Sequence, residues 1–211
     1  MLYMLPTSSS MLGLPTWYGC ITAPERWGRR PIEEGRIWCC DNGAFSGRFD
    51  PDKFIKTLES LAPYAATCKF IVAPDAIQDA SGTLELWREW APIIRSFGYP
   101  VALVAHNGMT PEDLPDDADA FFIGGSDEWR DAPSTHELIA AAKQRDMWIH
   151  VGRVNSNKRI RHWRALGADS SDGTHSAFAG LQNTVRLFNQ SLAEQPLFPA
   201  TPATLKNRSD A

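Results

Sequence analysis

The sequence predicts an α/β fold built on parallel strands, and three observations lead to this prediction. Short apolar runs recur along the chain and are apolar on both faces, as in strands that are covered on both sides. Segments with helical spacing of apolar residues lie between these runs. The alternation repeats roughly every 20–35 residues, which is typical of βαβ units and therefore of a parallel sheet.

Six apolar runs are predicted strands, each ending at a turn that contains polar residues or glycine. They are residues 2–5 (LYML), 36–40 (RIWCC), 69–73 (KFIVA), 101–105 (VALVA), 120–123 (AFFI) and 147–151 (MWIHV). A seventh strand is expected near Ala168 and Asp169.

Five helices are predicted between and after these strands. Pro92 lies inside the second helix and is expected to bend or end it. The expected helices are Asp50–Tyr64, one capped by Thr83, one capped by Ser134 or Thr135 that runs through Lys143, one begun by Asn155 or Ser156, and residues 176–192.

About seven strands fit either an open doubly wound sheet or a small TIM-type (β/α)8 barrel, complete or lacking one unit. The barrel is favoured because no GxGxxG follows the first strand and no GxxxxGK[ST] occurs, so the nucleotide-binding sheets lose their main support. No repeat or shift in composition marks a second domain. We therefore expect one barrel domain over residues 1–194 and a Pro-rich tail over residues 195–211, acting as an arm or strap.

The composition fits this single globular domain. The 211 residues are 43% hydrophobic and 22% charged, which excludes a disordered or coiled-coil chain. The net charge of −4 means that any nucleic acid must bind at a local patch. No apolar run reaches the ~18–20 residues of a membrane helix, and the N-terminus lacks the basic start of a signal peptide. A cytoplasmic protein without membrane contact is expected.

The cysteines predict neither a disulfide framework nor a metal centre. Cys39 and Cys40 are adjacent, and no CxxC or histidine at zinc spacing accompanies any of the four cysteines. We expect reduced, buried thiols at Cys20, Cys39, Cys40 and Cys68.

Polar residues follow the predicted strands at the positions where a parallel barrel builds its active site. Each of them also fits a turn or a helix cap, but their repetition at successive strand ends predicts one polar site. These residues are Asp41 and Asn42, Asp75, His106 and Asn107, Gly125 and Ser126, Arg153, and Asp169 and Asp172. His150 lies within a strand, which favours a hydrogen-bonded core residue.

Several carboxylates without a metal-ligand pattern favour glycosyl chemistry. One aspartate can attack an anomeric carbon while a second acid or base serves the leaving or incoming group. Amides and glycine backbone beside them suit recognition of a planar heterocycle. No Gly-x-Ser-x-Gly element and no supported Cys/His pair offers another nucleophile.

Two motifs resemble those of the tRNA-guanine transglycosylases. Residues 41–45 (DNGAF) resemble the family's Asp-Ser-Gly-Gly-Phe/Tyr element, and residues 167–172 (GADSSD) resemble its Gly-x-Asp-x-x-Asp element, whose last Asp is the nucleophile. Residues 72–75 (VAPD), 104–108 (VAHNG), 123–125 (IGG) and 150–152 (HVG) follow between them in the family's order. The resemblance covers roughly residues 36–175 and is closest to the small bacteriophage members that place 7-deazaguanine bases in DNA.

The resemblance implies a (β/α)8 barrel that exchanges guanine for a 7-deazaguanine, such as 7-cyano-7-deazaguanine, without a cofactor. Asp172 would be the nucleophile on C1′, and Asp41 would take a proton from the incoming base. Phe45 would pack near the base or lie in the core. The remaining base-binding residues would be Asn42, Asp75, His106, Asn107, Gly125, Ser126 and Asp169.

Departures from the family pattern favour DNA or a free nucleotide over tRNA as the substrate. The chain lacks the family's Cys-rich zinc subdomain, has lost the Gln of Val-Gln-Gly and is far shorter. A barrel nucleophile cannot reach a base inside a duplex, so single-stranded DNA or a flipped base is required. If the chain is encoded by a bacteriophage, it would act in the host cytoplasm.

Two basic groups are candidates for contact with the DNA backbone. Arg153, Lys158 and Arg159 lie with Arg161 and Arg164 after the strand at 147–151, where they would hold phosphates or form a solvated helix face. The second group is Arg26, Arg29, Arg30 and Arg36 with Trp17 and Trp27.

Two other functions stay open. An N-glycosidase would hydrolyse a nucleotide or modified base, with water in place of the incoming heterocycle. A non-catalytic barrel would bind a nucleotide or DNA. A homodimer also stays open, since no residue pattern fixes the oligomeric state.

Overall fold

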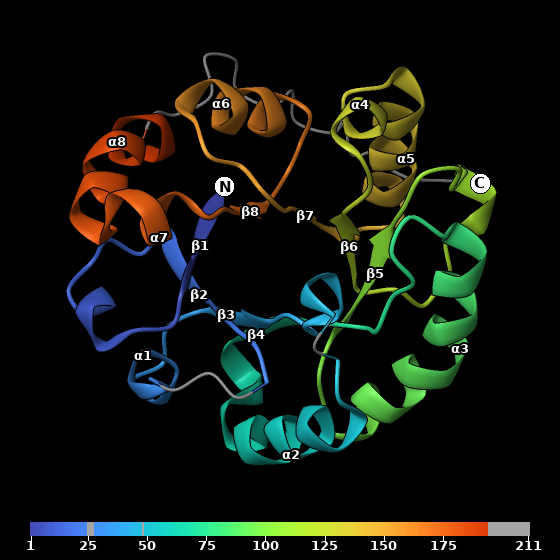
Figure 1. The fold of residues 1–211 in the computed structure, drawn as a ribbon, viewed down its shortest axis with the longest axis horizontal. Coiled ribbons are helices and arrows are strands. Elements are labelled where there is room, and N and C mark those ends of the chain that lie inside the picture. The colour runs from blue at the N-terminus through green and yellow to red at the C-terminus, as the bar shows by residue number, and fades with distance from the viewer. Residues whose placement is uncertain (25–27, 48, 194–211) are drawn as a thin grey trace, which may run out of the picture.

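The computed structural model describes residues 1–24, 28–47 and 49–193. Eight parallel strands pair in chain order and close into a barrel, with the last strand bonded to the first. Figure 1 shows the strands as a ring with the helices outside it. The predicted TIM-type (β/α)8 barrel is confirmed, and its ring of eight strands is closed. The expected tail over residues 195–211, together with Arg26 and Trp27, lies outside the described residues.

The barrel contains one strand more than the sequence predicts. The strands are β1 (Leu2–Pro6), β2 (Tyr18–Thr22), β3 (Trp38–Cys40), β4 (Cys68–Val72), β5 (Val101–Ala105), β6 (Ala120–Ile123), β7 (Trp148–Val151) and β8 (Ser170–Asp172). Strand β2 was missed because glycine and threonine interrupt its apolar pattern, although all five residues are buried. Strand β8 begins after Asp169 rather than at it, and it is polar in sequence.

The helices lie on the outside of the barrel. They are α1 (Arg30–Glu33), α2 (Pro51–Leu61), α3 (Ala80–Ser96), α4 (Asp127–Arg130), α5 (Pro133–Gln144), α6 (Asn157–Ala165), α7 (His175–Ala179) and α8 (Leu181–Ala193). Residues 7–17 and 106–119, both fully described, contain only the 3-10 turns η1 (Ser9–Met11) and η4 (Pro111–Asp113). No helix in the described part of the chain is long and apolar enough to cross a membrane.

Several helix ends differ from the predicted ones for local reasons. Asp79, not Thr83, caps α3, because its carboxylate accepts from Gly82 N–H. Pro92 lies inside α3 without ending it. The caps predicted for α5 lie within the helix, which starts after Ala132. The last predicted helix is divided into α7 and α8 at Gly180.

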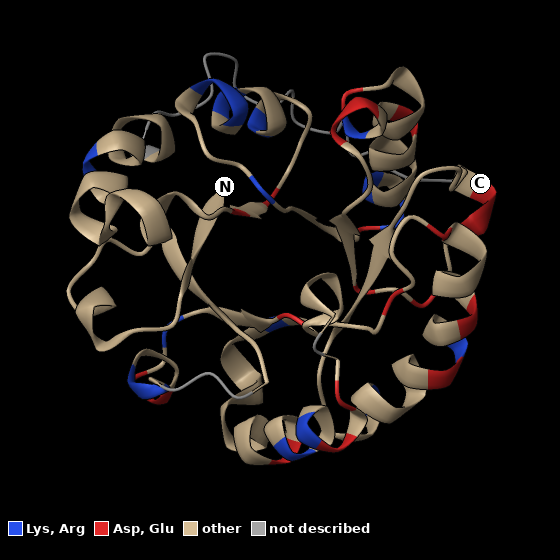
Figure 2. Cartoon of the chain, in the orientation of Figure 1, with Lys and Arg blue, Asp and Glu red and all other residues tan. Residues whose placement is uncertain are grey.

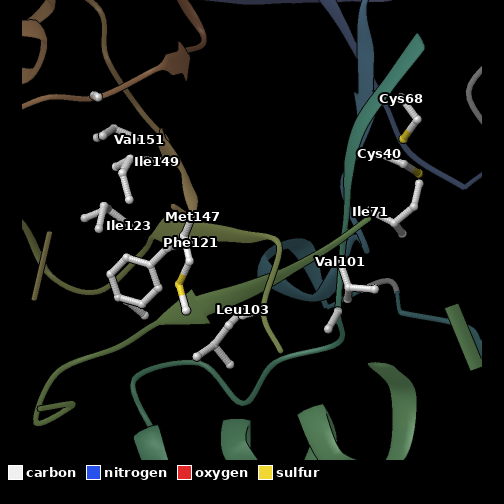
Figure 3. Close-up of a cluster of buried hydrophobic side chains, with 14 of the residues drawn as sticks. Cys40, Cys68, Ile71, Val101, Leu103, Phe121, Ile123, Met147, Ile149 and Val151 are labelled. Atoms are coloured by element: carbon white, nitrogen blue, oxygen red, sulfur yellow. The ribbon is translucent and has the colours of Figure 1, made fainter. Parts of the chain in front are cut away.

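Two apolar layers hold the barrel together. Alternation along each strand sends one set of side chains into the barrel and the other toward the helices. Met4, Ile21, Cys39, Phe70, Val72, Ala102, Val104 and Ala120 form the interior layer. The outer layer includes Leu103, Phe121 and Ile149, which Figure 3 shows beside Val101 and Val151. Full burial of one such side chain stabilises the fold by about 1.5–3 kcal/mol.

The four cysteines belong to these buried layers. All are free and buried, as predicted. Burial raises the pKa of each thiol, most strongly for Cys39 and Cys40, so the thiols stay protonated and pack as small apolar groups.

Candidate active site

Most of the predicted site residues meet where the strands end, on the side that we call the C-terminal face. Asp41 and Asn42 follow β3, Asp75 follows β4, and Asp172 is the last residue of β8. The predicted residues that follow β5, β6 and β7 are His106, Asn107, Gly125, Ser126 and Arg153.

Asp172 is held by the loop that follows β7. Its Oδ1 accepts the backbone N–H of Arg153 at 2.9 Å, and its main-chain oxygen accepts from Val154 N–H at 2.7 Å. The side chain keeps 21% of its surface exposed. Among the described residues no donor lies within hydrogen-bond reach of Oδ2, so one oxygen is anchored and the other is free.

Burial, followed by the negative charge of Asp41, raises the pKa of Asp172 to about 7. The Arg153 N–H and the charges of Arg130 and Arg153 oppose this rise. Asp172 and Asp41 therefore form an electrostatically coupled carboxylate pair. A carboxylate whose pKa is raised by burial and by a second carboxylate is typical of acid/base and nucleophilic sites.

Tight packing behind Asp172 fixes its place in the barrel. Tyr3 Oη donates to Val154 O at 2.9 Å, which ties β1 to the loop after β7. A Cβ atom at Gly173 would lie 2.5 Å from Val154 O and 2.7 Å from Tyr3 Oη. Only glycine fits directly after Asp172.

Asp41 lies in a tight turn at the end of β3. Its backbone N–H donates to Thr22 O at 2.8 Å, and its Oδ1 accepts from Gly43 N–H at 2.7 Å. The carboxylate thus caps its own turn, a common use of aspartate. The same turn presents its charge to Asp172.

Asn42, Asp75 and His106 bond to one another across the ends of β3, β4 and β5. Asn42 Nδ2 donates to Asp75 Oδ1 and to Ala73 O, both at 2.7 Å. Asp75 Oδ2 lies 2.7 Å from His106 Nε2. Both side chains of the Asp75–His106 pair are at least nine-tenths buried. Gln78 N–H donates to His106 Nδ1 at 3.3 Å, so His106 donates from Nε2 to Asp75.

This network occupies most of the polar atoms of two predicted base-binding residues. Asn42 donates both amide hydrogens to the protein, and its Oδ1 accepts from Ala44 N–H at 2.7 Å. His106 uses both ring nitrogens. Both residues hold Asp75, and direct contact of either with the base stays a prediction. Each Asp75 oxygen accepts one bond and retains a lone pair for a ligand.

Asn107 and Ser126 are locked to each other. Ser126 N–H donates to Asn107 Oδ1 at 2.9 Å, and Asn107 Nδ2 donates to Ser126 Oγ at 3.2 Å. Gly125, in the loop after β6, has a φ of 65°, and a Cβ atom there would collide with the Trp129 ring. The bond pair fixes the Gly125 backbone at the end of β6.

Arg153 and Phe45 lie against each other on the C-terminal face. The Arg153 guanidinium is 5.8 Å from the Phe45 ring centroid, and it also donates to Gly125 O. Phe45 is 73% exposed, so the alternative that placed it in the core is wrong. Arg153 has a φ of 58°, a left-handed conformation that costs a non-glycine residue about 1–2 kcal/mol.

The basic residues divide into exposed and internal groups. Figure 2 shows positive charge gathered on α6. Lys158 is exposed there, whereas Arg159 is half-buried and reaches Asp131 at 3.4 Å. Arg164 donates to Ser191 O and serves the packing of α6 on α8.

In the described part of the second basic group, Arg36 serves the fold, whereas Arg29 and Arg30 are exposed. Arg36 donates to the main-chain oxygens of Leu14, Pro15 and Tyr18, and Arg30 pairs with Glu34.

Asp169 does not belong to the site. Its Oδ2 accepts from Ile149 N–H at 2.8 Å and pairs with Lys143 at 3.0 Å, where β7 and β8 begin. It lines a cavity of about 330 Å³ with Lys69, Asp119 and Trp148 at the N-terminal end of the barrel. The prediction that Asp169 binds the base is wrong, because β8 separates it from Asp172.

Two residues near Asp172 were not predicted as part of the site. Arg130 is fully buried and donates to Gly152 O at 2.5 Å, but its sequence context is that of a surface helix. His150 is buried inside the barrel below Asp172, as its position within a strand indicates. Its neighbour Ser170 could not be recognised from the sequence, because a polar residue in a short strand looks like part of a loop.

Comparisons with known proteins assign no function to the site. No family model matches the chain, and no curated protein matches it. Among solved structures it is similar to a tryptophan synthase from M. tuberculosis, crystallised in an open form with BRD0059 bound. The sequence identity is 16% and the TM-score 0.49, over 74% of this chain and 60% of that chain. The chain thus spans 60% of that protein, and the resemblance to tRNA-guanine transglycosylases rests on sequence motifs alone.

Proposed function

We propose that this protein is a base-exchange transglycosylase that replaces guanine in DNA with a 7-deazaguanine. The observation that carries the proposal is the Asp172–Asp41 pair. Asp172 has one anchored and one free carboxylate oxygen, and Asp41 is close enough to raise its pKa. A nucleophile beside a second acid/base is what glycosyl transfer through a covalent intermediate requires.

The proposed reaction has two displacements at C1′ of the deoxyribose. Asp172 Oδ2 attacks C1′, and the C1′–N9 bond breaks with its electron pair leaving on guanine, which solvent protonates. N9 of the incoming 7-deazaguanine then attacks C1′ as Asp41 accepts its proton and the Asp172–C1′ bond breaks. In this proposal Asp75, which Asn42 and His106 hold, accepts hydrogens from the edge of the base.

The surface of the C-terminal face suits an unpaired strand. Phe45 is 73% exposed and Phe178 on α7 is 87% exposed, and both follow strands that end on this face. Exposed aromatic rings are platforms for unstacked bases, and each such contact contributes about 1–3 kcal/mol. Arg153 supplies positive charge beside Phe45, and Lys158 is exposed on α6.

Nucleoside mass spectrometry of the DNA product tests the proposal. Purified protein is incubated with single-stranded or duplex DNA and 7-cyano-7-deazaguanine, with Asp172→Asn in parallel. A deoxynucleoside that carries the deaza base, formed by the wild type alone, supports base exchange. Release of guanine without incorporation would favour the N-glycosidase, and DNA binding that is unchanged in the variant, without turnover, would favour the binding barrel.

A further inference from the structure

Three side chains inside the barrel form a hydrogen-bonded chain below Asp172. His150 on β7 lies beside Ser170 on β8, and Trp148 lies two residues before His150. Ser170 Oγ is 2.8 Å from Trp148 Nε1 and 2.8 Å from His150 Nδ1. Ser170 and His150 have no exposed surface. Ser170 therefore links the Trp148 indole to the His150 imidazole through a buried hydroxyl group.

The donor count fixes which ring nitrogen of His150 carries the proton. An indole N–H only donates, so Trp148 occupies a lone pair of Ser170 Oγ. The Ser170 hydroxyl hydrogen then needs an acceptor, and His150 Nδ1 supplies it. The opposite assignment would leave this hydrogen without an acceptor among the described residues. His150 is accordingly the tautomer with its proton on Nε2.

The Nε2–H group of His150 is buried and has no hydrogen-bond partner among the described residues. Asp172 Oδ1 lies 4.0 Å away. Phe70 and Phe122 flank the imidazole, with ring centroids 5.2 Å and 4.6 Å from it, and keep it in place. Burial lowers the pKa of His150 to about 3, so near neutral pH it presents a neutral N–H dipole.

Both donors near the carboxylate of Asp172 address the same oxygen. Oδ1 accepts from Arg153 N–H at 2.9 Å and faces His150 Nε2. A second bond to Oδ1 would fix the rotation of the carboxylate group and point Oδ2 away from the barrel floor. A nucleophile that is held in one orientation reacts faster, because misplacement by ~1 Å can cost about 100-fold in rate.

We propose that His150 is a positioning residue for Asp172. When substrate is bound, His150 Nε2–H donates to Asp172 Oδ1, and Asp172 Oδ2 remains as the attacking atom. This hydrogen bond needs a movement of roughly 1 Å, from the observed separation to hydrogen-bond length. The inference rests on the proposed base exchange, which it deepens by assigning separate tasks to the two oxygens of Asp172. Ser170 and Trp148 act indirectly, because their hydrogen bonds keep the proton of His150 on Nε2.

Two substitutions of His150 test this role. His150→Phe keeps a ring between Phe70 and Phe122 but removes the donor, whereas His150→Gln carries an amide N–H toward the former Nε2 position. We expect His150→Phe to slow single-turnover formation of the Asp172–DNA adduct by about 10–100-fold, with DNA affinity within about 3-fold of wild type. His150→Gln should recover most of the lost rate. Wild-type rates in His150→Phe, or no recovery in His150→Gln, would overturn the proposal.

A substrate-free measurement separates failure of this inference from failure of the proposed function. Histidine ¹⁵N NMR of the substrate-free wild type should show His150 as the neutral Nε2–H tautomer between pH 5 and 8. A protonated Nδ1 would overturn the His150 assignment, because no donor would then face Asp172 Oδ1. Absence of any adduct in the wild type would instead remove the base-exchange reaction.

Discussion

The guanidinium of Arg153 lies 5.8 Å from the ring centroid of Phe45, so the loop after β7 contacts the loop after β3 across the C-terminal face. The backbone N–H of the same arginine bonds to Asp172 Oδ1. Arg153 therefore joins the candidate nucleophile to the exposed aromatic ring. Its left-handed φ of 58° accompanies this double contact.

Replacement of Arg153 by glycine or alanine separates its backbone strain from its side-chain contacts. Both variants lose the guanidinium, but only glycine adopts the left-handed conformation without steric cost. We expect Arg153→Gly to be more stable than Arg153→Ala, with a free energy of unfolding higher by about 1 kcal/mol in urea unfolding. Both should bind single-stranded DNA equally weakly. Equal stability of the two variants would show that no strain is stored at this position.

Asp172→Asn should be more stable than wild type at high pH. The pKa of Asp172 is raised from 3.8 to about 7, so between these values the folded protein binds more protons than the unfolded chain, and the wild type loses stability as pH rises. Asparagine stays neutral throughout. Since the side chain is 21% exposed, we expect a gain of about 1–3 kcal/mol at pH 8 that disappears near pH 4. A pH-independent difference in unfolding free energy would contradict this account.

Asp41→Asn should change both the pH dependence and the fate of the intermediate. Removal of the Asp41 charge lowers the pKa of Asp172, so adduct formation should persist to lower pH than in the wild type. Without the base that accepts the N9 proton, the adduct should resolve slowly and accumulate. Quenched-flow sampling across pH 5–8 measures both effects. Full exchange activity in the variant would remove Asp41 from the mechanism.

Asn42→Asp tests the network that holds Asp75. A carboxylate at this position faces Asp75 Oδ1 and Ala73 O, which are both acceptors. We expect a loss of about 2–4 kcal/mol in unfolding free energy at pH 8, smaller at pH 5, where a proton can be shared. Asn107→Asp is the control, since Asn107 bonds to Ser126 and should cost less. A larger loss in the control would contradict the network.

Asp169→Asn should affect stability but not activity. The change removes a charge that pairs with Lys143 at the opposite end of the barrel from Asp172. We expect a loss of about 1 kcal/mol in unfolding free energy, because the pair is partly exposed, and exchange rates within about 2-fold of wild type. A large loss of exchange at unchanged stability would return Asp169 to the site.

The barrel can be predicted from the sequence because most of its strands carry their own apolar pattern. Runs such as residues 101–105 are apolar on both faces, which only a doubly covered strand requires. Strand β2 was missed and β8 was placed too early in the chain because the burial of both comes from neighbouring elements: all five residues of β2 are buried, and Ser170 and Ser171 of β8 are fully buried although both are polar. Tertiary pairing, not propensity, makes them strands.

The site is predictable as a set of strand ends but not as a set of contacts. Asp41, Asp75 and Asp172 lie where their positions after apolar runs place them. Sequence spacing could not show that Asn42 and His106 spend their polar atoms on Asp75, since these bonds join different strands. Asp169 was predicted at the site because it is only three residues from Asp172. The short strand β8 lies between them, so the two aspartates are at opposite ends of the barrel.

Intact-protein mass spectrometry tests the central claim most directly. Wild type, Asp172→Asn and Asp41→Asn are incubated with a guanine-containing single-stranded oligonucleotide without an incoming base, then quenched in denaturant. The account predicts a covalent adduct of protein and oligonucleotide that lacks one guanine, in wild type and in Asp41→Asn but not in Asp172→Asn. An adduct of equal yield in Asp172→Asn, or none in any of the three, would contradict Asp172 as the nucleophile.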